Sequence, residues 1–368
     1  MTSFFEYIGV FFISAFFAEA YRQSEIKRNF GKSSVWRRVF YVLLILLLPV
    51  LLACIRKGIG ADYDVYDKMF ELSYTSNAKT YFFYFPYTEI GNYGLFKLGY
   101  FIGGDSQSIF ALYSIITLTL FCIDMLYFKD RMPLFWCFFV MYVLYYSATY
   151  NTIRQMLAVA ISLFSLRFIE NKKFIPFILI IIVAMLFHST AMIMIIFYFL
   201  YNRRSTASAL ISKITLLILI LLPFIVIFLY RFGGSLPVIG RYFEFYDLSF
   251  NGSFAVDFVI RVVLYIFWVQ FLGYDIAFDQ RNQLYYYMLL ADFEFVVLSF
   301  FFTWAFRFSY YTSFAQIILV GNRIKSSANR ETRLSKGIFY FVLYAAVFWL
   351  LVVFWERDKI IPYISVFS

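Results

Sequence analysis

The chain has 368 residues, of which 63% are hydrophobic, 24% are aromatic and only 15% are charged. Soluble domains average about 45–50% apolar and about 25% charged residues, so this composition excludes an ordinary soluble protein. The formal net charge of +10 comes without any nucleic-acid-binding signature, and in membrane proteins excess Lys and Arg orient the loops. We therefore expect an all-α polytopic integral membrane protein that binds the lipid bilayer and no nucleic acid.

Apolar runs long enough for a helix to cross about 30 Å of hydrocarbon recur along the whole chain. The first run lacks the basic segment and cleavage site of a secretory signal peptide, so we expect it to be a retained span. The predicted spans are 4–20, 37–55, 108–128, 132–149, 153–169, 212–230, 254–272, 284–304 and 337–355, with a shorter candidate at 307–321. About 10–12 transmembrane helices are expected, with short re-entrant or interfacial helices on the external side.

The stretch 174–201 is too long for one span and short for two, and loop charge decides between them. Two short helices that meet near His188 leave the basic loops 22–38, 202–213 and 323–336 on one side of the membrane. A single span would move the last two loops to the external side, against the rule that basic loops stay in the cytoplasm. We therefore predict two short helices, 12 spans in all and both termini outside.

This topology gives one membrane domain, 1–368, with two large external segments, 56–107 and 231–253. In the first segment, YDVYDKMFEL (63–72) is expected to form a short helix at the membrane interface. NYGLFKLGYFIGG (92–104) is short and interrupted by glycine, which favours a re-entrant or interfacial helix. Its Gly99-x-x-x-Gly103 spacing matches a helix-packing motif.

The inventory of metal ligands is small. Cys54, Cys122 and Cys137 all lie in apolar stretches, and an odd number of buried cysteines argues against both a disulfide framework and metal ligation. A single histidine excludes the H-E-x-x-H zinc helix. We expect no metal and no cofactor.

Ionisable residues within or beside the spans are candidates for function, because each costs about 2.5–3.5 kcal/mol at the bilayer centre. Six of them fall at or near the external helix ends: Arg56, Glu89, Arg154, His188, Arg261 and Arg307. Arginine stays charged and can bind two phosphate oxygens at once, so several together would suit a lipid-linked pyrophosphate. Each arginine alone could instead pair with a carboxylate, cap a helix or reach the headgroups.

His188 is the only histidine of the chain. A lone histidine in an apolar segment is often a structural residue. Imidazole also has a pKa near neutrality, so at an outward-facing helix break it could act as a general base or contact a pyrophosphate. The sequence lacks a G-x-S-x-G elbow, a Walker loop and a CxxC pair, and no run of carboxylates suggests an ion pathway. A proton-coupled transporter is therefore disfavoured.

Five stretches resemble, in the expected order, the EpsG family of Wzy-like exopolysaccharide and O-antigen polymerases. They are IRKGIGADYDVYDKMF (55–70), Glu89 with Gly91, NTIRQMLAVAI (151–161), FHSTA (187–191) and AFRFSYYTSFAQIIL (305–319). The third is the clearest, since it is similar to the family pattern N-x-x-R-Q-x-L-A. Two positions depart from the family: Ala61 replaces a residue that more often carries a hydroxyl, and Thr190 occupies a small-residue position.

The resemblance implies a glycosyltransferase that joins oligosaccharide repeat units carried on undecaprenyl diphosphate. The reaction would take place in the bacterial cytoplasmic membrane, with the active site facing the periplasm or exterior. The implied catalytic residues are His188, Arg154, Glu89 and Asp62. The implied substrate-binding residues are Arg56, Tyr63, Tyr66, Asn151, Gln155 and Arg307. A chain-length regulator and a flippase would be partners.

Two alternatives stay open. A flippase or transporter of lipid-linked oligosaccharides would need charge that is accessible from both faces, and usually paired halves. A transferase like the O-antigen ligases would use the same lipid-pyrophosphate chemistry, and a large external loop fits it equally well.

Overall fold

The computed structural model describes residues 2–27, 35–201, 282–299 and 305–367, with a few isolated positions between 217 and 263. Within these ranges the chain is helical and forms no β-strand beyond an isolated bridge, which confirms the predicted all-α class. The predicted spans 212–230 and 254–272, the external segment 231–253 and Arg261 lie outside the described residues.

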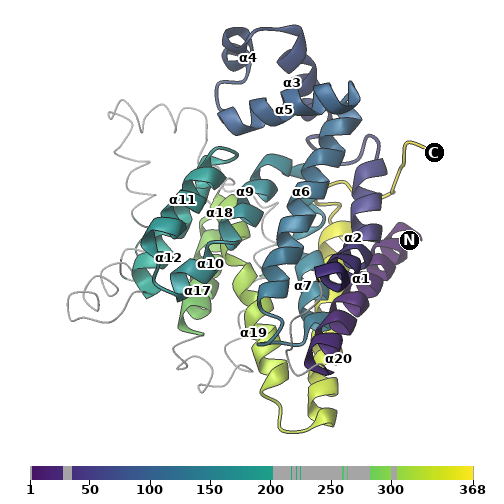
Figure 1. Ribbon diagram of the computed structural model, residues 1–368, viewed down its shortest axis with the longest axis vertical. Coiled ribbons are helices and arrows are strands. Elements are labelled where there is room, and N and C mark those ends of the chain that lie inside the picture. The colour runs from purple at the N-terminus through teal and green to yellow at the C-terminus, as the bar shows by residue number, and fades with distance from the viewer. Residues whose placement is uncertain are drawn as a thin grey trace. The chain divides into compact units, whose positions relative to one another are not determined.

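The chain divides into two compact units. The first comprises Met1–Ser165, Leu179–Ala191 and Val320–Ser368, and the second comprises Leu166–Ile178 and Met192–Leu319. In the first unit α1 packs against α2 and α7, α2 packs against α6, α6 packs against α9, and α20 packs against α7 (Figure 1). These helices are α1 (Thr2–Lys27), α2 (Val35–Ile55), α6 (Ser106–Tyr127), α7 (Leu134–Tyr145), α9 (Ile153–Leu163) and α20 (Arg330–Phe348).

Four helical runs in the described ranges are long and apolar enough to cross a membrane: Ser3–Lys27, Val35–Ile55, Ser106–Tyr127 and Arg330–Phe354. The last joins α20 to a π-helical turn, η5 (Trp349–Phe354).

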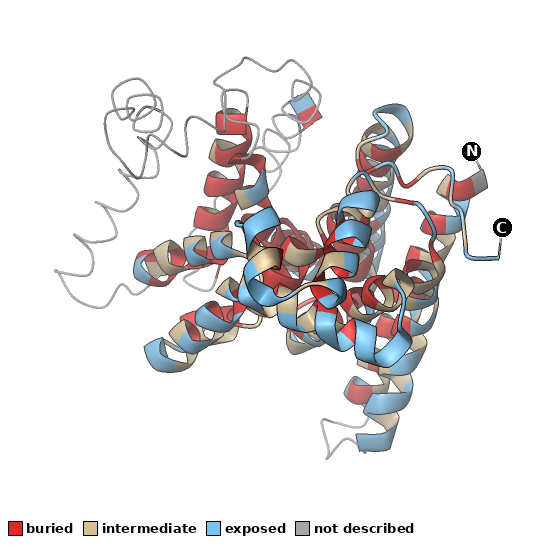
Figure 2. Ribbon diagram, turned by 90° about the horizontal axis from the view of Figure 1, so that it is seen from above, coloured by how far each residue is buried: buried red, intermediate tan, exposed pale blue. Residues whose placement is uncertain are grey.

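Helix α2 has one exposed apolar face and one buried face. Leu43, Leu47 and Leu51 recur every fourth residue on one face and are 63%, 59% and 49% exposed, whereas Ile45 and Ala53 on another face are fully buried. Figure 2 shows the same division of buried and exposed residues on other helices. An apolar stripe of this kind is stable only against hydrocarbon or a partner. Together with the lengths of the runs, this supports a polytopic membrane protein.

The predicted span 132–149 is divided in the structure into α7 and the short α8 (Ala148–Asn151), and α9 starts after a break at Thr152. The Thr149 hydroxyl donates to the Tyr146 carbonyl at 2.6 Å and the Thr152 hydroxyl donates to the Ala148 carbonyl at 3.2 Å. Such local bonds compete with regular helix geometry. The break places Asn151 and the start of α9 at one end of the first unit.

The stretch 174–201 forms α11 (Phe174–Met185), a 3-10 turn η1 (Ser189–Ile193) and α12 (Met194–Tyr201). The rings of Phe177 and Tyr198 stack with centroids 4.8 Å apart, so the chain doubles back between them. At 1.5 Å per residue α11 is about 18 Å long, shorter than the hydrocarbon layer. The predicted break near His188 is confirmed, and the two helices form a hairpin that returns the chain to its starting side.

The segment between α2 and α6 forms three helices, α3 (Tyr63–Thr75), α4 (Ala78–Tyr84) and α5 (Ile90–Gly103). Figure 1 shows them together at one end of α6. A Cβ at Gly99 would lie 2.5 Å from the Ile109 side chain, and one at Gly103 would lie 2.5 Å from Ser108. The two glycines therefore let α5 approach the start of α6 closely, as the packing motif predicts.

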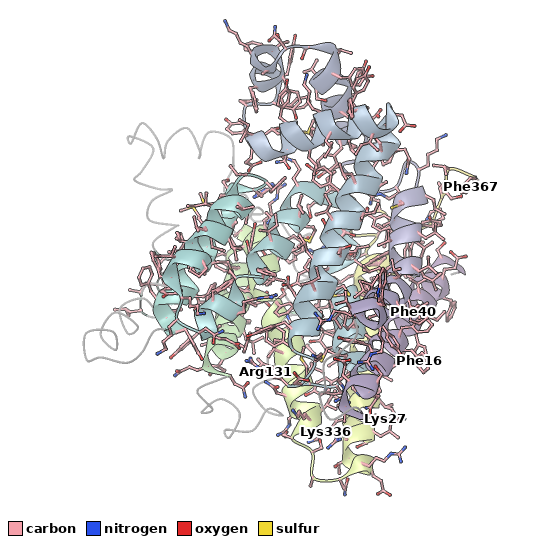
Figure 3. All side chains as sticks on the ribbon, in the orientation of Figure 1. Phe16, Lys27, Phe40, Arg131, Lys336 and Phe367 are labelled. Carbon is pink, nitrogen blue, oxygen red and sulfur yellow. The ribbon has the colours of Figure 1, made fainter. Side chains whose placement is uncertain are left out.

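Basic loops gather at the opposite end of this unit. Arg37 forms an ion pair with Glu25, and Lys129 lies 3.9 Å from the same carboxylate. The Lys325 ammonium donates to the Asp130 carbonyl at 2.6 Å. Figure 3 places the labelled Lys27, Arg131 and Lys336 near this end. The described parts of the predicted loops 22–38 and 323–336 thus lie at one end with 129–131, away from α3–α5, as the loop-charge argument predicts. The predicted loop 202–213 lies outside the described residues.

Candidate functional site

Arg154, at the start of α9, forms an ion pair with Glu89, which directly precedes α5. The Arg154 Nη1 atom donates to Glu89 Oε2 at 3.1 Å, and the two side chains are 21% and 16% exposed. The other carboxylate oxygen, Oε1, accepts the backbone N–H of Ser189 at 2.9 Å. One carboxylate therefore joins three segments that are far apart in the sequence, and solvent can still reach it.

The hairpin tip is fixed against the start of α5 by Asn92. This buried side chain donates from Nδ2 to the Phe187 carbonyl at 2.7 Å and to Glu89 Oε2 at 3.1 Å, and its Oδ1 accepts the Tyr113 hydroxyl at 2.7 Å. Beside it, a Cβ at Gly91 would lie 2.5 Å from the Leu186 carbonyl. Sequence reasoning missed Asn92 and Tyr113; the available signal was an amide side chain inside a largely apolar segment.

His188 lies at the tip of the hairpin, next to the residue that holds Glu89. Its Nδ1 atom is 2.7 Å from the Thr190 hydroxyl and 3.4 Å from the Thr190 backbone nitrogen. A backbone N–H can only donate, so the contact from Thr190 favours the tautomer of the neutral ring that carries its proton on Nε2. In that tautomer Nε2 is an N–H donor.

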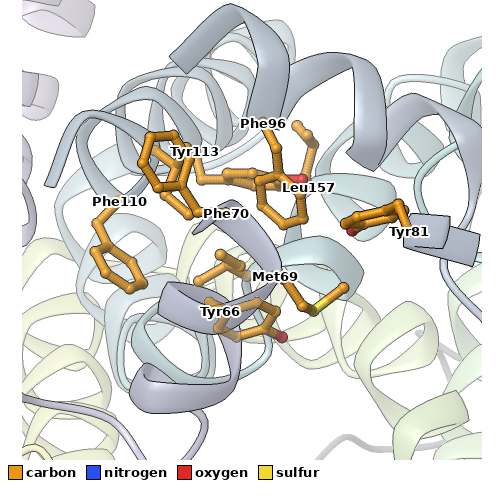
Figure 4. Close-up of a cluster of buried hydrophobic side chains, with 10 residues drawn as sticks. Tyr66, Met69, Phe70, Tyr81, Phe96, Phe110, Tyr113 and Leu157 are labelled. Atoms are coloured by element: carbon orange, nitrogen blue, oxygen red, sulfur yellow. The ribbon is translucent and has the colours of Figure 1, made fainter. Parts of the chain in front are cut away.

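Arg154 is supported from one side by a buried apolar cluster (Figure 4). The cluster comprises Tyr66, Met69, Phe70, Tyr81, Phe96, Ile109, Phe110, Tyr113, Ile153 and Leu157. Ile153 and Leu157 flank Arg154 on α9, and Tyr66 contributes a side-chain hydrogen bond to the guanidinium. Tyr66 is buried, so in this structure it orients Arg154 from within the cluster.

Arg56 is placed differently from Arg154. Its side chain is fully buried, with the guanidinium carbon 4.2 Å from the Tyr150 ring centroid and 5.1 Å from the Phe110 ring centroid. Among the described residues, no hydrogen-bond partner is present for any of its three guanidinium nitrogens. Burial lowers the pKa of this guanidinium, and the aromatic faces offset part of the desolvation through cation–π contact.

The C-terminal tail lies against the loop that carries Arg56. Lys57 donates its backbone N–H to the Ile364 carbonyl at 3.0 Å, and Val366 donates to the Ile55 carbonyl at 2.8 Å. Asn151 accepts the Asp62 backbone N–H at 2.9 Å and donates to the buried Asp358 carboxylate at 3.3 Å. The loop is thus held between the helix break and the tail, an arrangement that the sequence did not predict.

Gly60 makes that loop geometrically feasible. Its φ angle is +112°, and a Cβ there would lie 2.6 Å from the Tyr150 carbonyl. A side chain at this position would therefore be strained and would also collide with the backbone. Gly60 lets the Arg56 loop lie directly against the end of α8.

The remaining predicted residues occupy distinct environments. Tyr63 stacks on Phe110 with centroids 4.3 Å apart, and burial raises the pKa of its phenol. Gln155 is buried, and Asp62 is half-buried at the start of α3. Arg307 is exposed on α18 (Phe306–Thr312), in the second unit. The structure brings Arg154, Glu89 and His188 together. Asn151 and Asp62 contact each other at the loop that follows Arg56.

The second unit contains a buried carboxylate that sequence reasoning did not single out. Asp292, on α17 (Gln283–Ser299), accepts the Ser313 hydroxyl at 2.8 Å and the Gln316 amide at 2.9 Å. Neutral donors thus satisfy it within the fold. In the described ranges, no group of three or more His, Cys, Asp or Glu side chains is placed to hold a metal ion.

The EpsG family model matches residues 39–365, which is nearly the whole chain and includes Arg56, Glu89, Arg154 and His188. Neither a curated protein nor a solved structure matches the chain.

Proposed function

Because the chain belongs to the EpsG family of Wzy-like polymerases, we propose that it is a membrane glycosyltransferase that builds a surface polysaccharide. Its substrates are oligosaccharide repeat units carried on undecaprenyl diphosphate. The observation that supports this most directly is the partly exposed Arg154–Glu89 pair beside His188. A cation, a carboxylate and an imidazole N–H at one place suit the transfer of a sugar from a diphosphate leaving group.

In the proposed reaction, a hydroxyl of the acceptor unit attacks the anomeric carbon of the donor unit. A new C–O bond forms, and the bond between the anomeric carbon and the diphosphate oxygen breaks. The diphosphate leaves with the electron pair, and Arg154 binds its oxygens. His188 donates from Nε2 to the same leaving group, and the proton of the attacking hydroxyl passes to a carboxylate, Glu89 or Asp62.

The other predicted residues take supporting roles in this proposal. Tyr63 and Gln155 bind sugar hydroxyls, and Arg56 and Arg307 serve as further cations for lipid-linked diphosphates. Tyr66 and Asn151 position other residues of the site. Tyr66 orients Arg154, and Asn151 holds the loop that carries Arg56. A flippase that supplies the repeat units and a regulator of chain length complete the assembly.

The proposed site faces the outer side of the bacterial cytoplasmic membrane. This orientation is supported by the basic loops, which gather at the end of the first unit opposite α3–α5. Basic loops are retained on the cytoplasmic side, so the other end of the unit, with Glu89 and Arg154, would be external.

The experiment that tests the proposal is the incubation of purified protein with lipid-linked repeat units and separation of the products by length. A ladder of products is expected from the wild type, and Arg154→Ala and His188→Ala should leave single units. Lys79→Ala, which removes an exposed cation from the same external segment, is the matched control and should keep the ladder. Transfer of units across a vesicle membrane without elongation would instead indicate a flippase, and a single transfer to another acceptor would indicate a ligase.

A further inference from the structure

The Glu89 carboxylate is bound the way a protein binds a phosphate group. It receives three hydrogen bonds: from the Arg154 guanidinium at 3.1 Å, from the Asn92 amide at 3.1 Å and from the Ser189 backbone N–H at 2.9 Å. A guanidinium, a side-chain amide and a backbone N–H are the donors that commonly hold phosphate oxygens. The cation proposed to receive the diphosphate is therefore already occupied by an anion of the same chain.

We propose that Glu89 is an internal substitute for the substrate diphosphate: it binds Arg154 and the Ser189 N–H before a diphosphate does, and it releases them when a diphosphate binds. The inference rests on the proposed function for the identity of that anion. It adds an order of events, in which Glu89 becomes available only after the donor substrate has entered.

The geometry allows this exchange. Glu89 directly precedes α5 with extended backbone angles (φ −72°, ψ 149°) and makes no side-chain capping bond to that helix. Its side chain can therefore turn away without breaking α5. The two side chains are 21% and 16% exposed, so an entering diphosphate can reach the guanidinium from solvent. A diphosphate carries more negative charge than one carboxylate, so it competes effectively for Arg154.

The donors themselves stay in place when Glu89 leaves. Asn92 is held by the Phe187 carbonyl and the Tyr113 hydroxyl, and Tyr66 holds the Arg154 guanidinium. These contacts do not involve Glu89. The incoming diphosphate thus meets an organised set of donors and loses little of its binding free energy in ordering them.

The exchange also gives the released carboxylate a chemical role. While Glu89 accepts three hydrogen bonds, its oxygens are engaged by Arg154, Asn92 and the Ser189 N–H, so they do not contact an acceptor hydroxyl. Once the diphosphate has taken Arg154 and the Ser189 N–H, Glu89 is free to accept the proton of the acceptor hydroxyl as the glycosidic bond forms. The bound donor therefore creates the base that its own transfer requires.

The test compares the affinity of the detergent-purified protein for inorganic pyrophosphate and for a short prenyl diphosphate. Glu89→Gln keeps the shape of the side chain and removes the competing charge, so both ligands should bind about tenfold more tightly than to the wild type. Elongation by this variant should be lost. Glu71→Gln removes an exposed carboxylate from the same external segment and should change neither quantity.

Weaker or unchanged binding by Glu89→Gln would overturn the inference, because a carboxylate that merely orients Arg154 should weaken binding when it is neutralised. Tighter binding confined to the prenyl ligand would also overturn it, since the carboxylate is proposed to replace the diphosphate and not the lipid. Arg154→Gln should abolish pyrophosphate binding in both Glu89 backgrounds, and persistent binding would contradict the assignment of Arg154 as the shared cation. Elution as a single species and a cooperative melting transition above the assay temperature check that each variant is folded.

The two proposals fail separately. If the wild type elongates lipid-linked units but Glu89→Gln binds pyrophosphate no more tightly, the proposed function stands and this inference is wrong. If Glu89→Gln binds pyrophosphate more tightly but the wild type produces no ladder, the exchange at Arg154 stands and the proposed function is wrong.

Discussion

Arg56 pairs with Ser365 across an isolated antiparallel bridge, so the C-terminal tail lies against the backbone of a residue whose side chain is fully buried. The tail is also attached to the helices: the Tyr7 hydroxyl donates to the Ile360 carbonyl at 3.1 Å, and the Tyr363 hydroxyl donates to the Leu52 carbonyl at 2.9 Å. The last residues of the chain thus stabilise the loop that leads into α3 and, through Asn151, the region just before Arg154.

The attachment of the tail should weaken at alkaline pH. Burial raises the pKa of the Tyr363 phenol from about 10 to about 12. The stability contributed by the neutral phenol is complete below pH 10 and is lost as the pH rises through about 12. Tyr363→Phe removes the hydrogen bond to Leu52, should cost about 1 kcal/mol of unfolding free energy at pH 7, and should flatten the decline above pH 10.

Melting temperatures in detergent across this pH range check the prediction. Tyr74→Phe, at an exposed tyrosine of α3, is the control and should leave the wild-type profile unchanged. The same alkaline decline in Tyr363→Phe as in the wild type would show that another group controls it.

Arg56 should be dispensable for stability although it is fully buried. Within the described part of the chain, the guanidinium nitrogens have aromatic neighbours and no hydrogen-bond partner. Replacing buried ion pairs with well-packed apolar side chains is often neutral or stabilising by about 1–4 kcal/mol, and a buried cation without a hydrogen-bond partner also costs desolvation free energy. Arg56→Met should therefore keep or raise the melting temperature, whereas its effect on elongation reports whether the cation serves the substrate.

Arg154→Met is the matched comparison, because it leaves the Glu89 carboxylate without its cation and should lower the melting temperature. A strong loss of stability in Arg56→Met, equal to or larger than that of Arg154→Met, would contradict this account of the aromatic environment.

Asn151 should tolerate conversion to aspartate only when its partner is changed as well. The new carboxylate could still accept the Asp62 backbone N–H, but it would face the buried Asp358 carboxylate, which lies 3.3 Å from the present amide nitrogen. Two carboxylates at this distance repel, and the lost bond adds about 1–3 kcal/mol. Asn151→Asp alone should destabilise the protein. Its stability should recover as the pH falls, because a proton shared between the two carboxylates removes their repulsion.

The double variant Asn151→Asp with Asp358→Asn restores one donor and one acceptor, so it should regain much of the melting temperature at pH 7. If the double variant were as unstable as the sum of the two single changes, the direct contact between these residues would be wrong.

Uninterrupted apolar runs were predicted well, and interrupted runs only in part: the break near His188 was predicted, but the early end of α7 was not. The spans predicted at 37–55 and 108–128 agree with α2 (Val35–Ile55) and α6 (Ser106–Tyr127), because burial in lipid rewards every residue of such a run. The start of α9 at Ile153 agrees with the predicted span 153–169. The early end of α7 at Tyr145 and the separate short α8 were missed. Here the Thr149 hydroxyl bonds to the Tyr146 carbonyl of the preceding turn, and hydropathy does not register that choice.

The site follows the same division. Arg154, Glu89 and His188 could be identified because ionisable groups in apolar segments are costly and therefore conspicuous. Asn92 and Asp358 could not, since their roles depend on partners 95 and 207 positions away. No local pattern encodes such pairs. The burial of Arg56 was likewise not predicted, because it requires the distant C-terminal tail and the Tyr150 ring.

His188 should act in elongation as a donor from Nε2 and not as a base. The glutamine amide nitrogen can approximate the position of Nε2, whereas the asparagine amide nitrogen approximates that of Nδ1. His188→Gln should therefore retain a substantial part of the initial rate of elongation, and His188→Asn should lose about 100-fold. Thr190→Val, which removes the hydroxyl 2.7 Å from Nδ1, should lower the rate moderately because the ring loses its orientation. Equal losses in the glutamine and asparagine variants would indicate that the ring accepts a proton, since neither amide can do so, and would return the role of general base from Glu89 to His188.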